Sequence, residues 1–164
     1  SQFCVERASP EIQAKIRVEF FDKKNISPES FDLVTCFSTL EHLPDPLMAM
    51  KLVHQSLRTG RAVALVIHNE RSLAHRLLGR KSILYDLQHY QIFNHESMSL
   101  LLRQAGFEQF KYYPFVNNYR LGYWFDLLPL PKVIKRMIIS VMPKKVWQWR
   151  LSLDVGNQFW LAFK

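Results

Sequence analysis

The chain has 164 residues and a formal net charge of +8, and 48% of its residues are hydrophobic. This length corresponds to about one domain, and the apolar content excludes an intrinsically disordered chain. The positive charge favours an acidic partner, such as nucleic acid, an anionic membrane surface, or a phosphorylated or carboxylated substrate, without choosing among them.

The cysteines and the lengths of the apolar runs further limit the class of protein and its cellular setting. Cys4 and Cys36 lie in apolar stretches without the spacing of a zinc site or a disulfide framework, which favours a reducing, cytoplasmic setting. No stretch reaches the roughly 18 uncharged apolar residues needed to cross a bilayer. The chain begins at Ser1 and enters a strand-like segment at once, so we expect it to be an amino-terminally truncated piece of a longer protein.

The first 22 residues are expected to hold two strands with a short helix between them. Gln2 to Glu6 is predicted to be a strand that ends on a carboxylate. Ser9 followed by Pro10 marks a helix start. Arg17 to Phe21 is predicted to be the next strand, and Asp22 follows it directly. Both strands would therefore end on an acidic side chain.

The segment FDLVTCF, from Phe31 to Phe37, has the composition of a strand buried on both faces of a parallel sheet. Ser38 to His42 then brings hydroxyls, a carboxylate and an imidazole together where that strand would end, and Pro44 and Pro46 close the turn. In open α/β sheets ligands bind beyond the carboxyl ends of the strands. The sequence therefore predicts a site at this turn.

A helix and a second apolar strand follow the turn. Apolar residues recur at helical spacing from Leu47 to Leu57, and Gly60 is predicted to cap that helix. Ala62 to Ile67 is an uninterrupted apolar run that suits a central parallel strand. His68 comes directly after it, at a polar strand tip.

Another helix and strand are predicted further along the chain. Asn94 is a suitable N-cap for a helix from His95 to Gln104, and Gly106 is suited to end it. Phe107 to Phe115 is predicted to be a strand.

Residues 118–150 differ in composition from the rest of the chain. They hold seven basic residues against one acidic residue, and so account for +6 of the net charge of +8. They also hold three tryptophans and three prolines. A basic, amphipathic segment with tryptophans can lie at a membrane interface. The alternative is a helical lid over the active site with a solvated basic rim.

The order of these segments carries a family resemblance. A strand, the turn LEHLPDP, a helix that ends in a basic residue and a glycine, and an apolar strand together resemble the second half of a class I S-adenosylmethionine-dependent methyltransferase. Glu41, His42, Pro44, Asp45 and Pro46 match the family pattern as they stand. The resemblance covers most of the chain up to residue 116.

The resemblance implies an α/β, Rossmann-like methyltransferase sheet that is mostly parallel with an antiparallel last strand. Phe107 to Phe115 would be the sixth strand, and Asn157 to Phe163 would be the seventh, paired antiparallel with it. The partial methyltransferase core would comprise residues 1–117 and 151–164, and residues 118–150 would be the inserted segment or lid.

The resemblance also implies S-adenosyl-L-methionine as the cofactor. Glu6 matches the family's acidic residue that binds the ribose hydroxyls, and Asp22 the one that accepts a hydrogen bond from the adenine amino group. Phe37, Ser38 and Glu41 are the other predicted cofactor-binding residues. The alternative for both acidic residues is an ordinary exposed carboxylate. The family's glycine-rich turn is absent from this chain and is expected upstream.

Methyl transfer often needs a base for the acceptor proton, and histidine is the usual base near neutral pH. His42 matches the family's Glu-His pair, and His89 lies in a segment that usually borders the acceptor pocket. Both are therefore the predicted catalytic residues, with bracing of the surrounding loops as the alternative role. His68 is expected to line the acceptor pocket.

No metal site is predicted. Some family members that methylate catechol-like quinone precursors have a glutamate three residues before the position of Glu41, where this chain has Ser38. The remaining histidines, His54, His75 and His95, lie in helical patterns and are expected at the surface.

These observations favour an S-adenosylmethionine-dependent methyltransferase that transfers a methyl group to a hydroxyl of a small, lipid-linked or glycan acceptor. The alternative is a non-catalytic module that binds an anionic membrane surface on a methyltransferase-like frame. Nucleic-acid binding is least favoured, because the charge is concentrated in the lid-like segment and no nucleic-acid motif occurs. The expected location is cytoplasmic, and peripheral to a membrane if the basic segment binds lipid.

Overall fold

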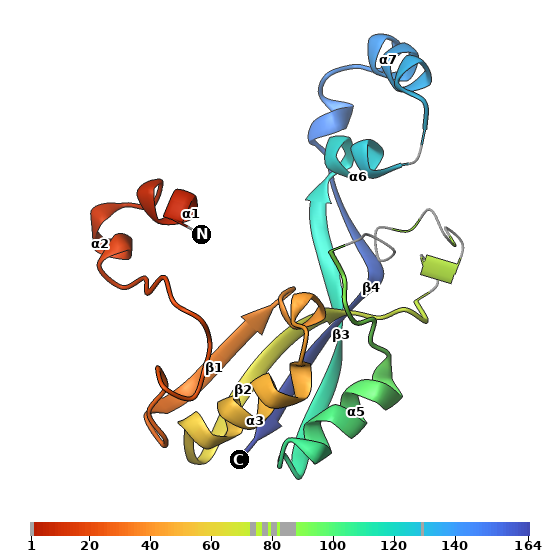
Figure 1. Ribbon diagram of the computed structural model, residues 1–164. Coiled ribbons are helices and arrows are strands. Elements are labelled where there is room, and N and C mark those ends of the chain that lie inside the picture. The colour runs from red at the N-terminus through yellow and green to blue at the C-terminus, as the bar shows by residue number, and fades with distance from the viewer. Residues whose placement is uncertain (1, 73–74, 77–78, 80–81, 83–87, 129) are drawn as a thin grey trace.

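The computed structural model describes residues 2–72, 75–76, 79, 82, 88–128 and 130–164 (Figure 1). Its elements in chain order are α1 (Gln2–Glu6), α2 (Pro10–Gln13), β1 (Phe31–Phe37), the short 3-10 helix η1 (Leu40–His42), α3 (Pro46–Ser56), β2 (Leu57–His68), α5 (His95–Gln104), β3 (Gln109–Arg120), α6 (Leu121–Leu127), α7 (Lys132–Val141), the 3-10 helix η4 (Val146–Gln148) and β4 (Arg150–Phe163).

The four strands form one sheet in the order β1-β2-β4-β3. β1 pairs parallel with β2, and β4 pairs antiparallel with both β2 and β3. The predicted α/β sheet with an antiparallel last strand is confirmed. The described sheet is mixed, with one parallel and two antiparallel pairings, because the two predicted amino-terminal strands do not join it.

The amino-terminal segment departs from the sequence prediction. Gln2–Glu6 is the helix α1 and not a strand, and no strand forms over Arg17 to Phe21. A short apolar run is compatible with either helix or strand, and a strand forms only where a neighbour pairs with its backbone groups. Figure 1 shows α1 and α2 standing away from the sheet. The helix start predicted at Pro10 is confirmed.

α5 begins at the predicted residue, and α3 begins at Pro46, one residue before the predicted Leu47. Asp45 caps α3, its side chain accepting a hydrogen bond from the Met48 N–H at 2.8 Å, and Pro46 occupies the first turn. Asn94 caps α5 in a reciprocal capping box with Ser97. Gly60, in contrast, lies inside β2, so its predicted role as a helix cap is wrong.

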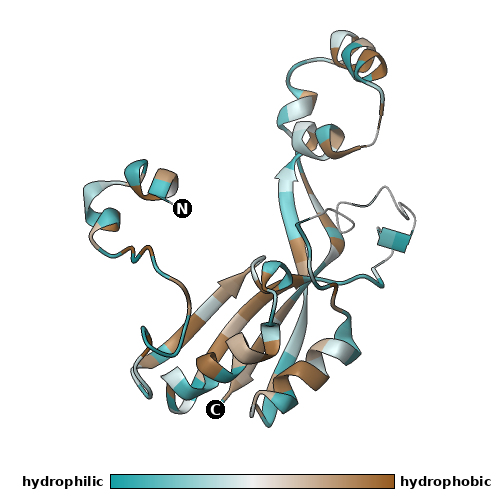
Figure 2. Ribbon diagram, viewed as in Figure 1, coloured by the Kyte–Doolittle hydropathy of each residue, from teal (hydrophilic) through white to brown (hydrophobic). Residues whose placement is uncertain are grey.

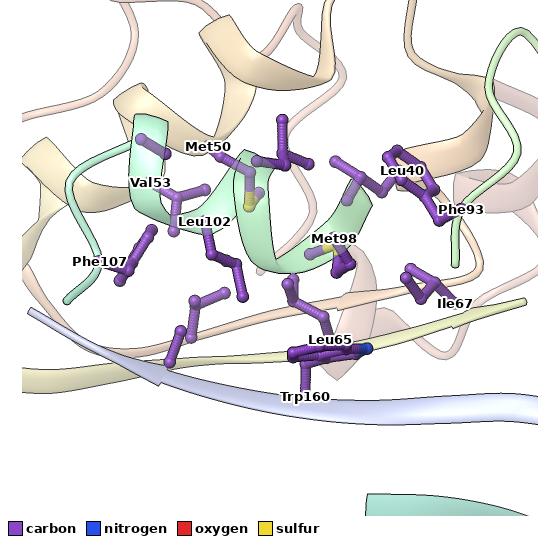
Figure 3. Close-up of a cluster of buried hydrophobic side chains, with 14 of the residues drawn as sticks. Leu40, Met50, Val53, Leu65, Ile67, Phe93, Met98, Leu102, Phe107 and Trp160 are labelled. Carbon is purple, nitrogen blue, oxygen red and sulfur yellow. The ribbon is translucent and has the colours of Figure 1, made fainter. Parts of the chain in front are cut away.

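Both helices pack on the same face of the sheet, and the core lies between them and the strands (Figures 1 and 3). The side chains that form it come mainly from α3, α5, the segment after α5 and the central strands, and include Met50, Val53, Leu65, Met98, Leu102, Phe107 and Trp160. Trp160 is fully buried, and its indole N–H donates to the Gln158 side chain at 3.0 Å. This core fixes β2 and β4, and with them the carboxyl end of β2.

β1 is buried on one face only. Val34 and Cys36 pack against the core, whereas Leu33 and Phe37 are 56% and 55% exposed. Alternate residues of a strand point to opposite faces, so the exposed pair belongs to the face away from α3 and α5. The prediction of burial on both faces is therefore wrong. β1 is an edge strand of the described sheet, and both core helices lie on the other side.

The segment predicted to be an insertion forms the far end of a long hairpin. β3 continues to Arg120 and β4 starts at Arg150, and α6, α7 and η4 lie between them (Figure 1). The Trp124 indole N–H donates to the Leu151 carbonyl at 2.8 Å, which holds α6 against β4. Of the helices formed by described residues, none has the length and apolar character required to cross a membrane.

Candidate functional site

The candidate site lies at the carboxyl ends of β1 and β2, which meet at one edge because the two strands are parallel. The chain leaves β1 through a sharp turn at Ser38, a residue other than glycine in the left-handed region with φ of 44°. The Ser38 N–H donates to the Val66 carbonyl of β2 at 2.7 Å, which holds this backbone in place. Strained turns of this kind cluster at functional sites.

A buried carboxylate–histidine pair stands behind the turn. Glu41 is only 1% exposed, and its Oε1 accepts hydrogen bonds from the His68 backbone N–H at 2.9 Å and from His68 Nδ1 at 3.0 Å. A carboxylate can only accept, so the Nδ1 proton lies on the Glu41 side and His68 Nε2 keeps its lone pair. Glu41 Oε2 is buried and has no hydrogen-bond partner among the described residues.

The charge of Glu41 is stabilised in this position. Burial raises the pKa of its carboxyl, but the hydrogen bond from the His68 side chain, the backbone N–H donors of Glu41 and His68, and the charge interaction with His68 together outweigh burial. The net result is a pKa below the usual value for glutamate. Glu41 is therefore an anion that can orient His68 and stabilise it when it is protonated.

Residues 88–91 lie at the same edge of the sheet, where they contact Glu41 and His42. The Glu41 carbonyl accepts from the Tyr90 N–H at 2.9 Å, which ties this segment to η1. His42 Nδ1–H donates to the Gln88 carbonyl at 2.8 Å. The His42 and His89 rings are stacked with centroids 4.7 Å apart, and the His89 and His68 centroids are 5.9 Å apart.

We call Glu41, His42, His68 and His89 the histidine cluster. Each of these four residues was predicted from the sequence to lie at the cofactor or acceptor site, but the Glu41–His68 hydrogen bonds were not predicted. His75 was expected at the surface, and this is wrong: it is 6% exposed and hydrogen-bonded to the Ser82 hydroxyl. Burial, with a smaller contribution from the charge of His68, lowers the pKa of His75 to about 4. His75 is therefore neutral near pH 7.

The cluster has the chemistry of a proton acceptor. Three imidazoles at one strand edge supply ring nitrogens that can accept a proton, and the carboxylate beside His68 orients that ring as in other base–orienter pairs. Among the described histidine, cysteine, aspartate and glutamate residues, no group of three is arranged to hold a metal ion.

The predicted cofactor residues are divided between two places. Phe37, Ser38 and Glu41 lie together at the turn after β1. Glu6 is exposed at the end of α1, away from that turn (Figure 1). Asp22 lies in the loop before β1, where its carboxylate accepts from the Lys24 N–H.

The neighbouring residue Lys23 shows where Asp22 lies in the fold. Lys23 lines a small hollow with Gln55 and Ser56, at the carboxyl end of α3. α3 has 11 residues and is therefore about 16 Å long, and η1 precedes its other end. The structure therefore does not bring Glu6 and Asp22 to the histidine cluster.

A larger hollow of about 590 Å³ lies at the opposite end of the sheet from the cluster. His54, Gly106, Glu108 and Lys164 are among its lining residues. Burial, followed by the charge of Lys164, lowers the pKa of His54 despite a hydrogen bond with Gly106. None of the described residues that line this hollow forms a hydrogen-bonded pair of a histidine and a carboxylate like that of Glu41 and His68.

Comparison with known proteins gives a family and a fold. Residues 2–111 match a family model described as a methyltransferase domain. The ubiquinone biosynthesis O-methyltransferase of Vibrio cholerae is 26% identical over an aligned length of 108 residues, and the match covers 58% of this chain and 44% of that protein. The enzyme of the same name from Pseudomonas syringae is 34% identical over 59 residues, 35% of this chain and 25% of the relative. The matched part is thus less than half of these relatives.

Solved structures share the fold at low sequence identity. A methyltransferase from Thermotoga maritima, described as S-adenosylmethionine-dependent and a possible histamine N-methyltransferase, has a TM-score of 0.60 at 20% identity, covering 94% of this chain and 68% of that one. The YcgJ protein of Bacillus subtilis has a TM-score of 0.64 at 16% identity, covering 100% and 79%. These matches agree with the Rossmann-like sheet described above.

Proposed function

Because the chain belongs to the methyltransferase domain family, we propose that it carries the acceptor side of an S-adenosylmethionine-dependent methyltransferase that methylates a hydroxyl. The observation that supports this most is the buried Glu41 carboxylate holding the His68 ring at the carboxyl edge of the sheet. A hydroxyl acceptor needs a base, and this pair has the form of one.

S-adenosylmethionine, when bound, supplies a methyl group on a positively charged sulfur. Phe37, Ser38 and Glu41 are the residues that we propose to lie beside it, because they form the turn at the carboxyl end of β1 and the Glu41 anion favours a positive charge nearby. Glu6 and Asp22 remain predicted ligands of the ribose and the adenine. Their roles would require the segment before β1 to lie closer to the carboxyl edge than it does here.

In the proposed reaction, His68 Nε2 removes the proton from the acceptor hydroxyl as the acceptor oxygen forms its bond to the methyl carbon. The carbon–sulfur bond breaks, and its electron pair stays on sulfur, which becomes the neutral thioether. The proton remains on His68, and Glu41 stabilises the resulting imidazolium. His42 and His89, the catalytic residues predicted from the sequence, lie beside His68 and are proposed to flank the acceptor in this arrangement.

The acceptor is proposed to be a small hydroxylated molecule, and more narrowly a lipid-linked one. The curated relatives are named for ubiquinone biosynthesis and O-methyl transfer, and residues 118–150 are basic and apolar. A lipid-linked acceptor would place the protein in the cytoplasm at a membrane surface. A glycan acceptor would not require the apolar residues of this segment.

The test is a transfer assay with the full-length protein. Methyl-labelled S-adenosylmethionine is supplied with a panel of catechol-like quinone precursors and glycans, and with histamine as an amine acceptor. We expect one S-adenosylhomocysteine to be released for each methyl ether formed on a hydroxyl acceptor. Methylation of the amine alone, or binding of the donor without turnover on any acceptor, would overturn O-methyl transfer.

The second candidate is the non-catalytic module that binds a membrane surface. It is favoured by one observation, the exposed apolar residues of α7. The same protein sample separates the two: calorimetry with S-adenosylmethionine gives heat for the enzyme, whereas the module binds anionic vesicles and gives none.

A further inference from the structure

α7 has no buried residue and carries large apolar side chains on its surface. Val133, Met137 and Val141 are 69%, 64% and 83% exposed. Monomeric proteins rarely leave a contiguous apolar patch of this kind uncovered, and such patches mark interaction sites. In Figure 1, α7 lies at the end of the hairpin, remote from the sheet, so this patch is not an extension of the core.

The side chains of α7 are segregated around the helix. At about 100° per residue, one arc of about 140° holds all but one of its large apolar residues. We call this arc the apolar face, and it comprises Val133, Ile134, Met137, Ile138 and Val141. The remaining residues form the polar side, and they are Lys132, Lys135, Arg136, Ile139 and Ser140.

The side of α7 that carries Lys135 and Ile138 faces the rest of the hairpin, because these two residues are less exposed than the others of the helix. Lys135 Nζ donates to the Asp126 carbonyl in α6 at 2.6 Å. Val133 and Met137 lie on the opposite side of the helix from Lys135, so this part of the apolar face points outward. Figure 2 shows hydrophobic and hydrophilic residues side by side on α7 at this end of the molecule.

The charges around α7 determine the kind of surface that would cover it. Lys132 and Arg136 lie on the helix, and Lys144 and Lys145 follow it, against the single acidic Asp126 in residues 118–150. A second copy would bring a like charge of +6 against this one. An anionic bilayer instead offers phosphates to the basic side chains and an acyl boundary to the apolar face.

We propose that α7 is a membrane-docking helix that lies in the plane of an anionic bilayer. The apolar face enters the boundary between headgroups and acyl chains, and the basic residues contact the phosphates. Trp149, 66% exposed near the same end, suits the headgroup level. This inference rests on the peripheral location in the proposed function and is independent of whether methyl transfer occurs.

The experiment is co-sedimentation of the full-length protein with vesicles of phosphatidylcholine containing about 30% phosphatidylglycerol, whose negative surface potential attracts basic segments. The test variant replaces Val133, Met137 and Val141 by serine. We expect its apparent affinity for these vesicles to fall about tenfold or more, because the apolar contribution to interfacial binding scales with buried apolar area.

The matched control is Ile139→Ser, an exposed apolar residue on the polar side of the same helix. It should change the affinity less than about twofold, because the side chain does not face the bilayer. Lys132→Gln with Arg136→Gln should weaken binding to the anionic vesicles and leave the weak binding to pure phosphatidylcholine unchanged. Circular dichroism of each variant should match the parent, since every substituted side chain is exposed.

Equal loss in the triple variant and in Ile139→Ser, or no binding of the parent protein, would overturn the proposal. So would a parent dimer that the triple variant converts to a monomer without vesicles, because the apolar face would then bind a second copy. The triple variant should keep the affinity of the parent for S-adenosylmethionine. Vesicle binding without donor binding would contradict the proposed enzyme and leave the docking helix standing.

Discussion

Replacement of His68 by asparagine is expected to lower kcat for methyl transfer about 100-fold or more, the range for loss of a general base. Asparagine keeps an amide N–H close to the position of Nδ1, so the hydrogen bond to the buried Glu41 carboxylate can persist while the basic Nε2 is lost. We expect KM for the acceptor and the affinity for the donor to stay within about twofold, because the change removes a transition-state interaction.

Steady-state kinetics of three matched variants checks this assignment. His42→Asn and His89→Gln should each lower kcat less than about tenfold, because neither ring bonds to a carboxylate among the described residues. His95→Asn should match the parent, because the exposed His95 ring contacts Tyr112 and Trp160 and not the histidine cluster. A larger loss for His42→Asn than for His68→Asn would contradict His68 as the base and support the residue predicted from the sequence.

Replacement of Glu41 by alanine is expected to lower the free energy of unfolding by about 3 kcal/mol, the lower end of the range for breaking a buried pair, because His68 is partly exposed. Two N–H donors of His68 would lose their partner, and a small cavity would form behind the turn. Glu41→Gln keeps an accepting oxygen and should lower the free energy of unfolding by less than Glu41→Ala does. Urea unfolding at pH 7 measures both variants.

The stabilisation from Glu41 should depend on pH. Its pKa in the folded protein is lower than the usual 4.5, so its contribution is complete above about 4.5 and is lost as the pH falls through the folded value. The difference in stability between the parent and Glu41→Gln should therefore shrink below pH 4.5.

Two results would contradict this account of Glu41. One is a stability difference between the parent and Glu41→Gln that stays constant down to the acid transition. The other is an equally large loss on Glu96→Ala, whose carboxylate is 74% exposed and pairs with Arg71 on the surface, where a single ion pair contributes little.

Two elements were predicted correctly because short-range sequence patterns define their ends. Phe31–Phe37 and His95–Gln104 form with the bounds that the sequence indicated, because a bounded apolar run and an N-cap define them without help from distant residues. The strand predicted at Gln2–Glu6 was wrong, because these five residues carry no signal that separates helix from strand. In the described sheet, no further strand pairs with β1.

The candidate site was predictable in place but not in its contacts. The polar turn after β1 and His68 after β2 were both recognised as strand tips, and the parallel pairing brings them to one edge. The hydrogen bonds from His68 to Glu41 link positions 27 residues apart, and they depend on the register of that pairing and on the backbone turn at Ser38. No local pattern encodes either one.

In the proposed function, donor and acceptor meet beside the histidine cluster, and the histidine ring signals in NMR are a test of this claim. Single His→Asn variants assign the signals, and S-adenosylhomocysteine is then titrated into the protein. We predict that the signals of His42, His68 and His89 shift, while those of His54 and His95 do not. A shift at His54 with none in the cluster would place the ligand in the hollow at the other end of the sheet and contradict the claim.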